Sequence, residues 1–142
     1  MPRHAVTIAL LLIATTASAR EPISDDFRCL TTAGPNPIQL EFRMFSDPNS
    51  KWTGGYIKYR KSKAVIPLVL KSTEATDKPE GRPCDFTDTW VEVSDGEITG
   101  EYEVAHQAAL INSFVYRSRK TGKEYSFAEV DGPRGDDACA WN

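Results

Sequence analysis

Residues 38–44, Ile38-Gln39-Leu40-Glu41-Phe42-Arg43-Met44, alternate apolar and polar side chains without a break. Successive side chains of a strand point to opposite faces, so this period of two predicts a strand with one buried face. A turn cluster at 33–36 precedes the stretch, and a loop at 47–50 follows it. The same unit, a short strand between turn residues, recurs along most of the chain.

Seven further strands are expected, and most of their links have hairpin length. They are 26–31, 55–60, 64–70, 89–93, 97–104, 111–117 and 124–130. Pro67 favours an edge or a bulge in its strand, because proline has no N–H to donate. No segment keeps a helical period for three turns, so at most a short helix would fit, within 72–85 or in the tail. The pattern predicts an all-β protein, a small antiparallel β-barrel or compact sandwich of about eight strands, mostly a meander.

The first 19 residues have the three parts of a secretory signal peptide. Arg3 and His4 form a basic start, 5–14 is an apolar run, and Ala17 and Ala19 occupy the small-residue positions of a cleavage site. The apolar run is shorter than the roughly 20 residues that cross a bilayer. We therefore expect residues 1–19 to be removed, and residues 20–142 to form a single β-rich domain with an irregular tail at 131–142. The expected location is the periplasm or the exterior.

The composition of residues 20–142 limits the kinds of partner. Removal of 1–19 takes away one cation, Arg3, so 16 basic side chains remain against 20 acidic ones, and the net charge is −4. No stripe of lysines and arginines indicates a nucleic-acid partner. A mildly acidic surface suits a basic protein partner. No anchor to the membrane is expected, since no cysteine stands at the cleavage site.

Catalytic and cofactor motifs are absent from the sequence. His106 is the sole histidine of residues 20–142, there is no Gly-x-Ser-x-Gly elbow, and neither a phosphate loop nor a dinucleotide fingerprint occurs. The cysteines lack the spacing of a zinc site. We therefore expect no metal, no cofactor and no enzymatic activity.

The three cysteines, Cys29, Cys84 and Cys139, leave one unpaired if an oxidising compartment pairs two of them. A meander alternates its links between two ends of the sheet. The links near 34, 62, 95–96 and 121–122 fall at one end, and those at 47–51, 72–85, 106–109 and after 130 fall at the other. This places Cys84 and Cys139 at the same end, so a Cys84–Cys139 disulfide is the first choice. Cys29–Cys139, near a barrel closure, and Cys29–Cys84 remain open.

The end with the longer, irregular links is the expected binding surface, because scaffolds commonly mount function on such loops. Arg82 could present its guanidinium to the carboxylates of a glycosidase cleft, or could pair with Glu80 instead. Aromatic side chains at loops are frequent interface anchors. The candidate partner-binding residues are Trp52, Arg82, Asp85, His106 and Trp141.

The chain resembles the periplasmic lysozyme inhibitors of Gram-negative bacteria in architecture. It shares with them its size, its export signal, an opening Phe27-Arg28-Cys29 strand, eight short strands and a cysteine near the C-terminus. Gly54-Gly55-Tyr56 is similar to the serine-glycine…tyrosine motifs of that family, although the serine is absent and Thr53 is the nearest hydroxyl. The resemblance implies an exported protein that inhibits a cell-wall hydrolase. Immunity proteins against such hydrolases share the size, the export signal and the lack of catalytic motifs.

Two other functions fit the sequence. A carrier would hold an apolar ligand inside the barrel, and large inward residues such as Trp90, Tyr102 and Phe114 would leave no room for one. A structural envelope protein would have no enzyme target.

The signal peptide leads to the first prediction. N-terminal sequencing of the exported protein should begin at Arg20, because cleavage follows Ala19. Mature protein that retains Met1 would contradict the export expectation.

Overall fold

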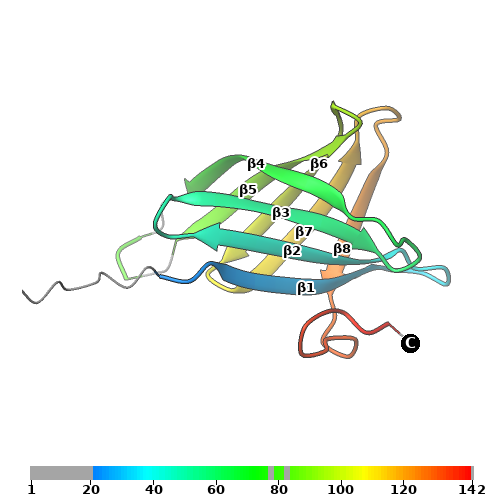
Figure 1. The fold of residues 1–142 in the computed structure, drawn as a ribbon, viewed down its shortest axis with the longest axis horizontal. Helices are drawn as coiled ribbons and strands as arrows, with labels where there is room; N and C mark the ends of the chain where they lie inside the picture. Colours follow the sequence, from blue (N-terminus) through cyan, green and yellow to red (C-terminus); the bar gives the residue numbers. More distant parts are fainter. Residues whose placement is uncertain (1–20, 77–78, 82–83, 142) are drawn as a thin grey trace, which may run out of the picture.

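The computed structural model describes residues 21–76, 79–81 and 84–141, so the segment 1–19 predicted to be a signal peptide and the candidate residue Arg82 lie outside them. Eight antiparallel strands close into a barrel in sequence order (Figure 1). The strands are β1 (Ser24–Thr32), β2 (Gln39–Asp47), β3 (Trp52–Tyr59), β4 (Ile66–Thr76), β5 (Asp85–Ser94), β6 (Glu97–Gln107), β7 (Leu110–Ser118) and β8 (Glu124–Glu129). The prediction of an all-β meander of eight strands is confirmed, and of the two architectures considered it is the barrel that forms.

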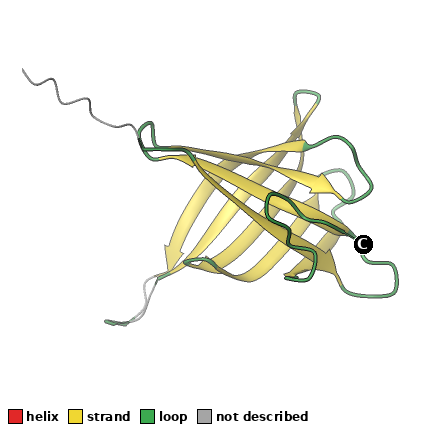
Figure 2. Ribbon diagram, turned by 60° about the horizontal axis from the view of Figure 1, so that its bottom comes forward, coloured by secondary structure: helices red, strands yellow, loops and turns green. Residues whose placement is uncertain are grey.

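The links gather at two ends of the barrel, as the meander requires (Figure 2). We call the end with links 33–38, 60–65, 95–96 and 119–123 the hairpin end. The end with links 48–51, 77–84 and 108–109, where β1 also begins, is the irregular end. The two ends differ less in link length than the sequence indicated, since β4 runs to Thr76 and shortens the long link. Of the described residues in 72–85 and in the tail, none forms a helix.

The β4 strand extends beyond its predicted end at residue 70, because its pairing with β5 resumes after a bulge. The register with β5 shifts between Leu70 and Ser72 and then continues as far as Thr76 opposite Asp85. Pro67 lies in regular pairing opposite Tyr56, so the bulge is not at the proline.

Inward side chains fill the barrel. Phe42 meets Trp90 edge-on at a ring-centroid distance of 5.5 Å and Phe114 at 5.2 Å, and Tyr102 packs on Phe114 at 5.7 Å. Each such burial contributes on the order of 1.5–3 kcal/mol. The core consists of Leu30, Leu40, Phe42, Ile57, Leu68, Trp90, Tyr102, Val104, Phe114 and Phe127. This filling is the inward packing that would count against the carrier alternative.

The disulfide joins Cys29 to Cys139 with a Cα–Cα distance of 5.7 Å, while Cys84 is free and exposed. The prediction of a Cys84–Cys139 bridge is therefore wrong. The physical reason is the short last strand. Because β8 ends at Glu129 opposite Leu30, and Val130 N–H then donates to the Cys29 carbonyl at 2.8 Å, the chain leaves the barrel beside Cys29 in the middle of the wall.

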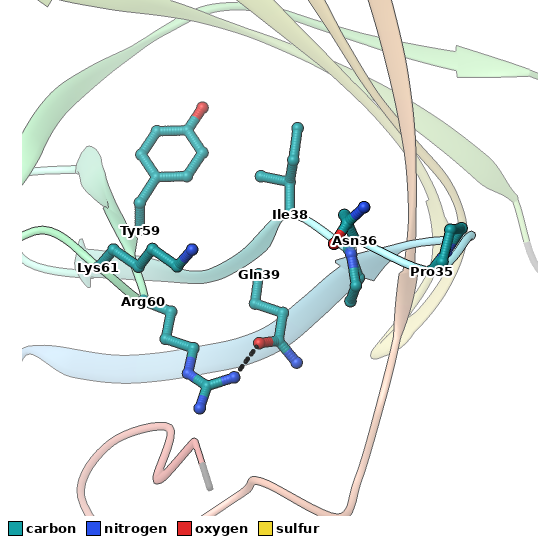
Figure 3. Close-up of a pocket in the computed structure, with 8 residues that line it drawn as sticks. Pro35, Asn36, Ile38, Gln39, Tyr59, Arg60 and Lys61 are labelled. Carbon is teal, nitrogen blue, oxygen red and sulfur yellow. Dashed lines mark hydrogen bonds between the residues drawn. The ribbon is translucent and has the colours of Figure 1, made fainter.

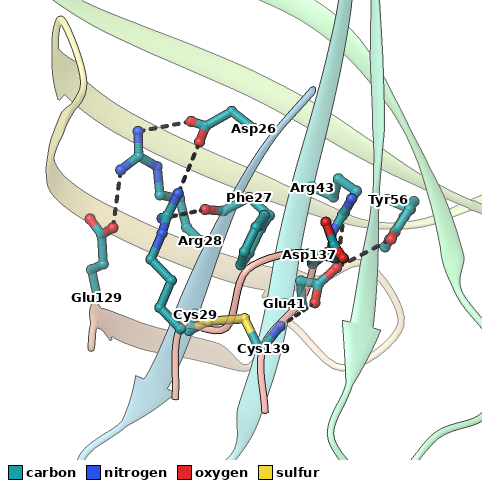
Figure 4. Close-up of a disulfide and its surroundings, with 11 residues drawn as sticks. Asp26, Phe27, Arg28, Cys29, Glu41, Arg43, Tyr56, Glu129, Asp137 and Cys139 are labelled. Atoms are coloured by element: carbon teal, nitrogen blue, oxygen red, sulfur yellow. Dashed lines mark hydrogen bonds and ion pairs between the residues drawn. A yellow bond between two sulfur atoms is a disulfide. The ribbon is translucent and has the colours of Figure 1, made fainter. Parts of the chain in front are cut away.

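The tail consequently lies on the outer wall of β1 and β2 and not among the loops of the irregular end (Figure 4). Its Arg134 donates to the Phe27 carbonyl at 2.7 Å. The backbone N–H of Cys139 donates to Glu41 Oε2 at 2.8 Å, and Arg43 donates to the Asp137 carbonyl. The guanidinium carbons of Arg43 and Arg134 lie 4.8 and 4.6 Å from the ring centroid of Phe27.

Glu41 organises this outer layer even though it points away from the core. Its side chain is only 4% exposed, and its Oε1 accepts from Arg43 Nε at 3.1 Å and from the Tyr56 hydroxyl at 3.2 Å. A buried carboxylate is stable only with such donors. The tail thus forms an ordered layer over the outer face of β1 and β2.

The disulfide leads to a stability prediction. Closure of the 110-residue separation between Cys29 and Cys139 should stabilise the fold by up to about 5 kcal/mol in the chain-entropy model. In urea unfolding, the double variant Cys29→Ala/Cys139→Ala should lose much of this contribution to the free energy of unfolding. Cys84→Ser is the matched control and should unfold like the parent.

A thiol reagent provides an independent check. It should label Cys84 alone in the native protein, because this thiol is exposed and unpaired. Labelling of Cys29 or Cys139 would contradict the pairing.

Candidate functional site

A recess of about 330 Å³ opens at the irregular end, directly above the core. Its floor is apolar, and its rim carries charged groups from β1 and β5 and the imidazole of His106 from β6. The lining residues are Asp26, Arg28, Phe42, Met44, Asp88, Trp90, Val104, His106, Ala108, Ala109 and Ile111. Alternation explains the set, because Asp26 and Arg28 share the inner face of β1 with Leu30, and Asp88 shares the inner face of β5 with Trp90.

The recess continues into a second one of about 530 Å³ at the side of the barrel. The two share Arg28, Ala109 and Ile111. This side recess lies where β8 stops at Glu129 while β7 begins at Leu110, so the wall between β7 and β1 is incomplete at this end. The short final strand therefore shapes the recess as well as the position of the tail.

Charge pairs hold the rim in place. Arg28 Nη2 lies 2.8 Å from Asp26 Oδ2, and Arg28 Nη1 lies 3.2 Å from Glu129 Oε1. Asp88 accepts from the Thr73 hydroxyl at 2.6 Å and lies 3.1 Å from His106 Nε2. Two buried donors on residues of this recess, Arg28 Nε and the indole N–H of Trp90, have no hydrogen-bond partner among the described residues.

His106 holds the two-residue link between β6 and β7. Its Nδ1 lies 3.1 Å from the Ala108 carbonyl, its Nε2 faces Asp88, and its ring stacks on Phe86 at 5.7 Å. Ala108 has a φ of 51°, in the left-handed region that few residues other than glycine adopt. The His106 contact supports this strained turn, which places Leu110 at the rim. Both ring nitrogens face an acceptor, so neither is directed at a nucleophile.

The predicted binding residues do not all meet. Asp85 begins β5 and accepts from Gln107 at 3.1 Å, close to His106, and Trp52 begins β3 at the same end. Trp141 is half-buried within the tail on the outer wall and is separate from this group. Arg82 lies outside the described residues, so its expected role stays a prediction. Gly54-Gly55-Tyr56 lies within β3, and Tyr56 contacts Glu41 beneath the tail.

Three large apolar side chains are exposed at the irregular end: Ile23, Trp52 and Leu110 are 58%, 54% and 61% exposed. The Trp52 ring lies over Gly54, where an added Cβ would come within 2.6 Å of it. Sequence reasoning found Trp52 but missed Ile23, Leu110, Asp26, Arg28 and Asp88. Asp26 and Arg28 could have been found from their alternation with Leu30, which places them on the inner face near the end of a strand.

A buried polar cluster closes the barrel at the hairpin end, opposite the recess. Glu92 accepts from the Tyr102 hydroxyl at 2.9 Å and from the Thr99 hydroxyl at 2.6 Å, and the hydroxyls of Tyr59 and Tyr102 lie 3.0 Å apart. Burial raises the pKa of Tyr102, Tyr59 and Tyr116 above the ordinary value of 10.0. The cluster completes the core at the hairpin end.

Neither a metal nor a membrane helix is indicated within the described part of the chain. It contains no group of three or more His, Cys, Asp or Glu side chains arranged to hold a metal ion. It also forms no helix of the length and hydropathy needed to cross a bilayer. No family model, no curated protein and no solved structure matches the sequence or the fold.

The tyrosine cluster predicts an alkaline loss of stability. Because the folded pKa of Tyr102 is raised, the unfolded chain loses this proton first, so the contribution is present below about pH 10 and declines above it. Tyr102→Phe should cost about 1–3 kcal/mol at neutral pH, because Glu92 loses a donor. The same change should also reduce the alkaline slope by up to about 1.4 kcal/mol per pH unit.

Urea unfolding between pH 8 and 11 measures both effects. A Cys84→Ser background prevents thiol–disulfide exchange at alkaline pH. An unchanged alkaline slope in the Tyr102→Phe variant would contradict the assignment.

Proposed function

We propose that this protein is an exported binding protein that inhibits a partner enzyme, a cell-wall hydrolase, and that the irregular end makes the contact. The observation that carries the proposal is the combination at that end of three exposed apolar side chains with a charged recess above a filled core. Exposed apolar groups around a polar recess are typical of protein interfaces. Because the core blocks the barrel, the recess suits a protruding side chain of a partner and not an enclosed ligand.

The charges at the irregular end favour a basic partner. The described carboxylates there include Glu21, Asp25, Asp26, Asp47, Glu74, Glu80, Asp85 and Asp88. The cations beside them are fewer: Arg28, Lys51, Arg43, which pairs with Asp25, and Arg134, which pairs with Asp26. Complementary potentials speed association and exclude like-charged partners. A lysine or arginine of the partner could enter the recess toward Asp88, with Trp52 and Leu110 packing at the rim.

The protein is proposed not to be an enzyme. Support comes from His106, whose two ring nitrogens face Asp88 and the Ala108 carbonyl, which leaves no ring nitrogen to act as a base toward a nucleophile. The disulfide is consistent with an oxidising, exported compartment.

The test is inhibition of purified hydrolases. Residues 20–142 should slow the clearing of a peptidoglycan suspension by one member of a panel of lysozymes and peptidoglycan amidases, at a stoichiometric ratio. Trp52→Ala and Leu110→Ala should each weaken inhibition roughly 5- to 30-fold, as the loss of about 1–2 kcal/mol at an interface anchor implies.

Val65→Ala is the matched control, because Val65 is an apolar side chain of comparable exposure, 46%, on link 60–65 at the opposite, hairpin end. It should inhibit like the parent. Failure to inhibit any hydrolase of the panel would contradict the proposed function. Equal losses in the Val65→Ala variant would show that the irregular end was wrongly assigned.

A further inference from the structure

Basic side chains gather on two links of the hairpin end. Link 60–65 holds Arg60, Lys61 and Lys63, and link 119–123 holds Arg119, Lys120 and Lys123. All six of these residues are exposed. The carboxylates among the links and strand ends at this end are Asp95 and Glu97 of the β5–β6 hairpin and Glu124 at the start of β8, and Glu124 is paired with Arg117 at 2.6 Å, so cations dominate.

Link 60–65 has a fixed shape. Ser62 N–H donates to the Tyr59 carbonyl at 2.9 Å, and the Ser62 hydroxyl donates to the Ala64 carbonyl at 2.9 Å. Arg60 Nη1 donates to Gln39 Oε1 at 2.7 Å on the outer side, while Tyr59 and Ile38 point the other way, into the barrel (Figure 3). These contacts order the link on which Lys61 and Lys63 are exposed.

Link 119–123 is also ordered by its own hydrogen bonds. Ser118 N–H donates to the Lys123 carbonyl at 2.9 Å, and Gly122 N–H donates to the Ser118 carbonyl at 2.9 Å. Gly122 has a φ of 69°, which allows the tight turn. Arg119 N–H donates to the Thr99 carbonyl of β6 at 3.0 Å, which fastens the link to the barrel. Both basic links are thus pre-organised.

Apolar side chains stand among these charges. Val65 is 46% exposed beside Lys63, and Ile98 is 39% exposed at the start of β6. The two basic links alternate around the rim with the uncharged link 33–38 and the β5–β6 hairpin. The six cations are divided between two separate links, so together they present a broad basic face that suits an extended anionic plane.

We propose that the hairpin end docks reversibly on an anionic lipid bilayer surface. Lysine and arginine near such a surface gain attraction from its negative potential, and Val65 and Ile98 would enter the headgroup layer. The acidic irregular end, at the opposite pole of the barrel, is repelled by the same surface. The charge distribution therefore orients the barrel with the recess directed away from the lipid.

Vesicle sedimentation tests the proposal with residues 20–142. The protein should sediment with vesicles of phosphatidylcholine and phosphatidylglycerol and not with phosphatidylcholine alone. Binding should fall as salt rises from about 0.05 M to about 0.5 M, because screening shortens the range of the attraction. Each of the substitutions Lys61→Ala, Lys63→Ala, Lys120→Ala and Lys123→Ala should weaken binding roughly fivefold.

The matched control is Lys71→Ala, an exposed lysine of β4 that is paired with Glu101 at 3.2 Å on the outer wall. It should bind vesicles like the parent. Equal binding to vesicles without phosphatidylglycerol, or an equal loss in Lys71→Ala, would overturn the proposal. Soluble heparin is added as a competitor at the same concentration of negative charge as the vesicles. If heparin abolishes vesicle binding at that concentration, the hairpin end is assigned to a soluble polyanion instead of a bilayer.

The result is independent of hydrolase inhibition. The lysine variants should inhibit in solution like the parent, and Trp52→Ala should bind vesicles like the parent.

Discussion

The rest of the structure depends on the small radius of a closed eight-stranded barrel. At this size the inward side chains of all strands meet at the axis and just fill it. Phe42, Trp90, Tyr102 and Phe114 make that contact in edge-on and tilted ring pairs. Since these side chains fill the axis, the surfaces that remain exposed are the two ends and the outer wall.

The closure between β1 and β8 is the shortest seam of the barrel, with three paired positions from Leu30 to Thr32. The disulfide and the tail strengthen the wall beside it. Cys139 bonds to Cys29, and Glu41 binds the backbone of Cys139 and the side chains of Arg43 and Tyr56. Because β8 stops early, the barrel wall stays open at one side of the irregular end. The short β8 strand therefore creates the recess and also leaves a weak seam that the tail strengthens.

The two ends differ in charge and in the chemistry of their mouths. Tyrosines around Glu92 close the hairpin end, and outside them basic links project into solvent. At the irregular end, Asp26 and Asp88 border a recess with apolar side chains around it. An anionic surface at one pole and a basic protein at the other would use these ends without competing for the same residues.

The sequence by itself determined the all-β class, the number and order of the strands, and the end to which each link belongs. Alternation such as that of 38–44 and turn residues such as Asp95-Gly96 act locally, so they can be recognised without a structure. It also placed Trp52, Asp85 and His106 at one end of the barrel. Only the tertiary structure decided the disulfide, the place of the tail with Trp141, and the recess of Asp26, Arg28 and Asp88. These depend on where β8 stops relative to β1, a register across about a hundred residues that no local pattern encodes.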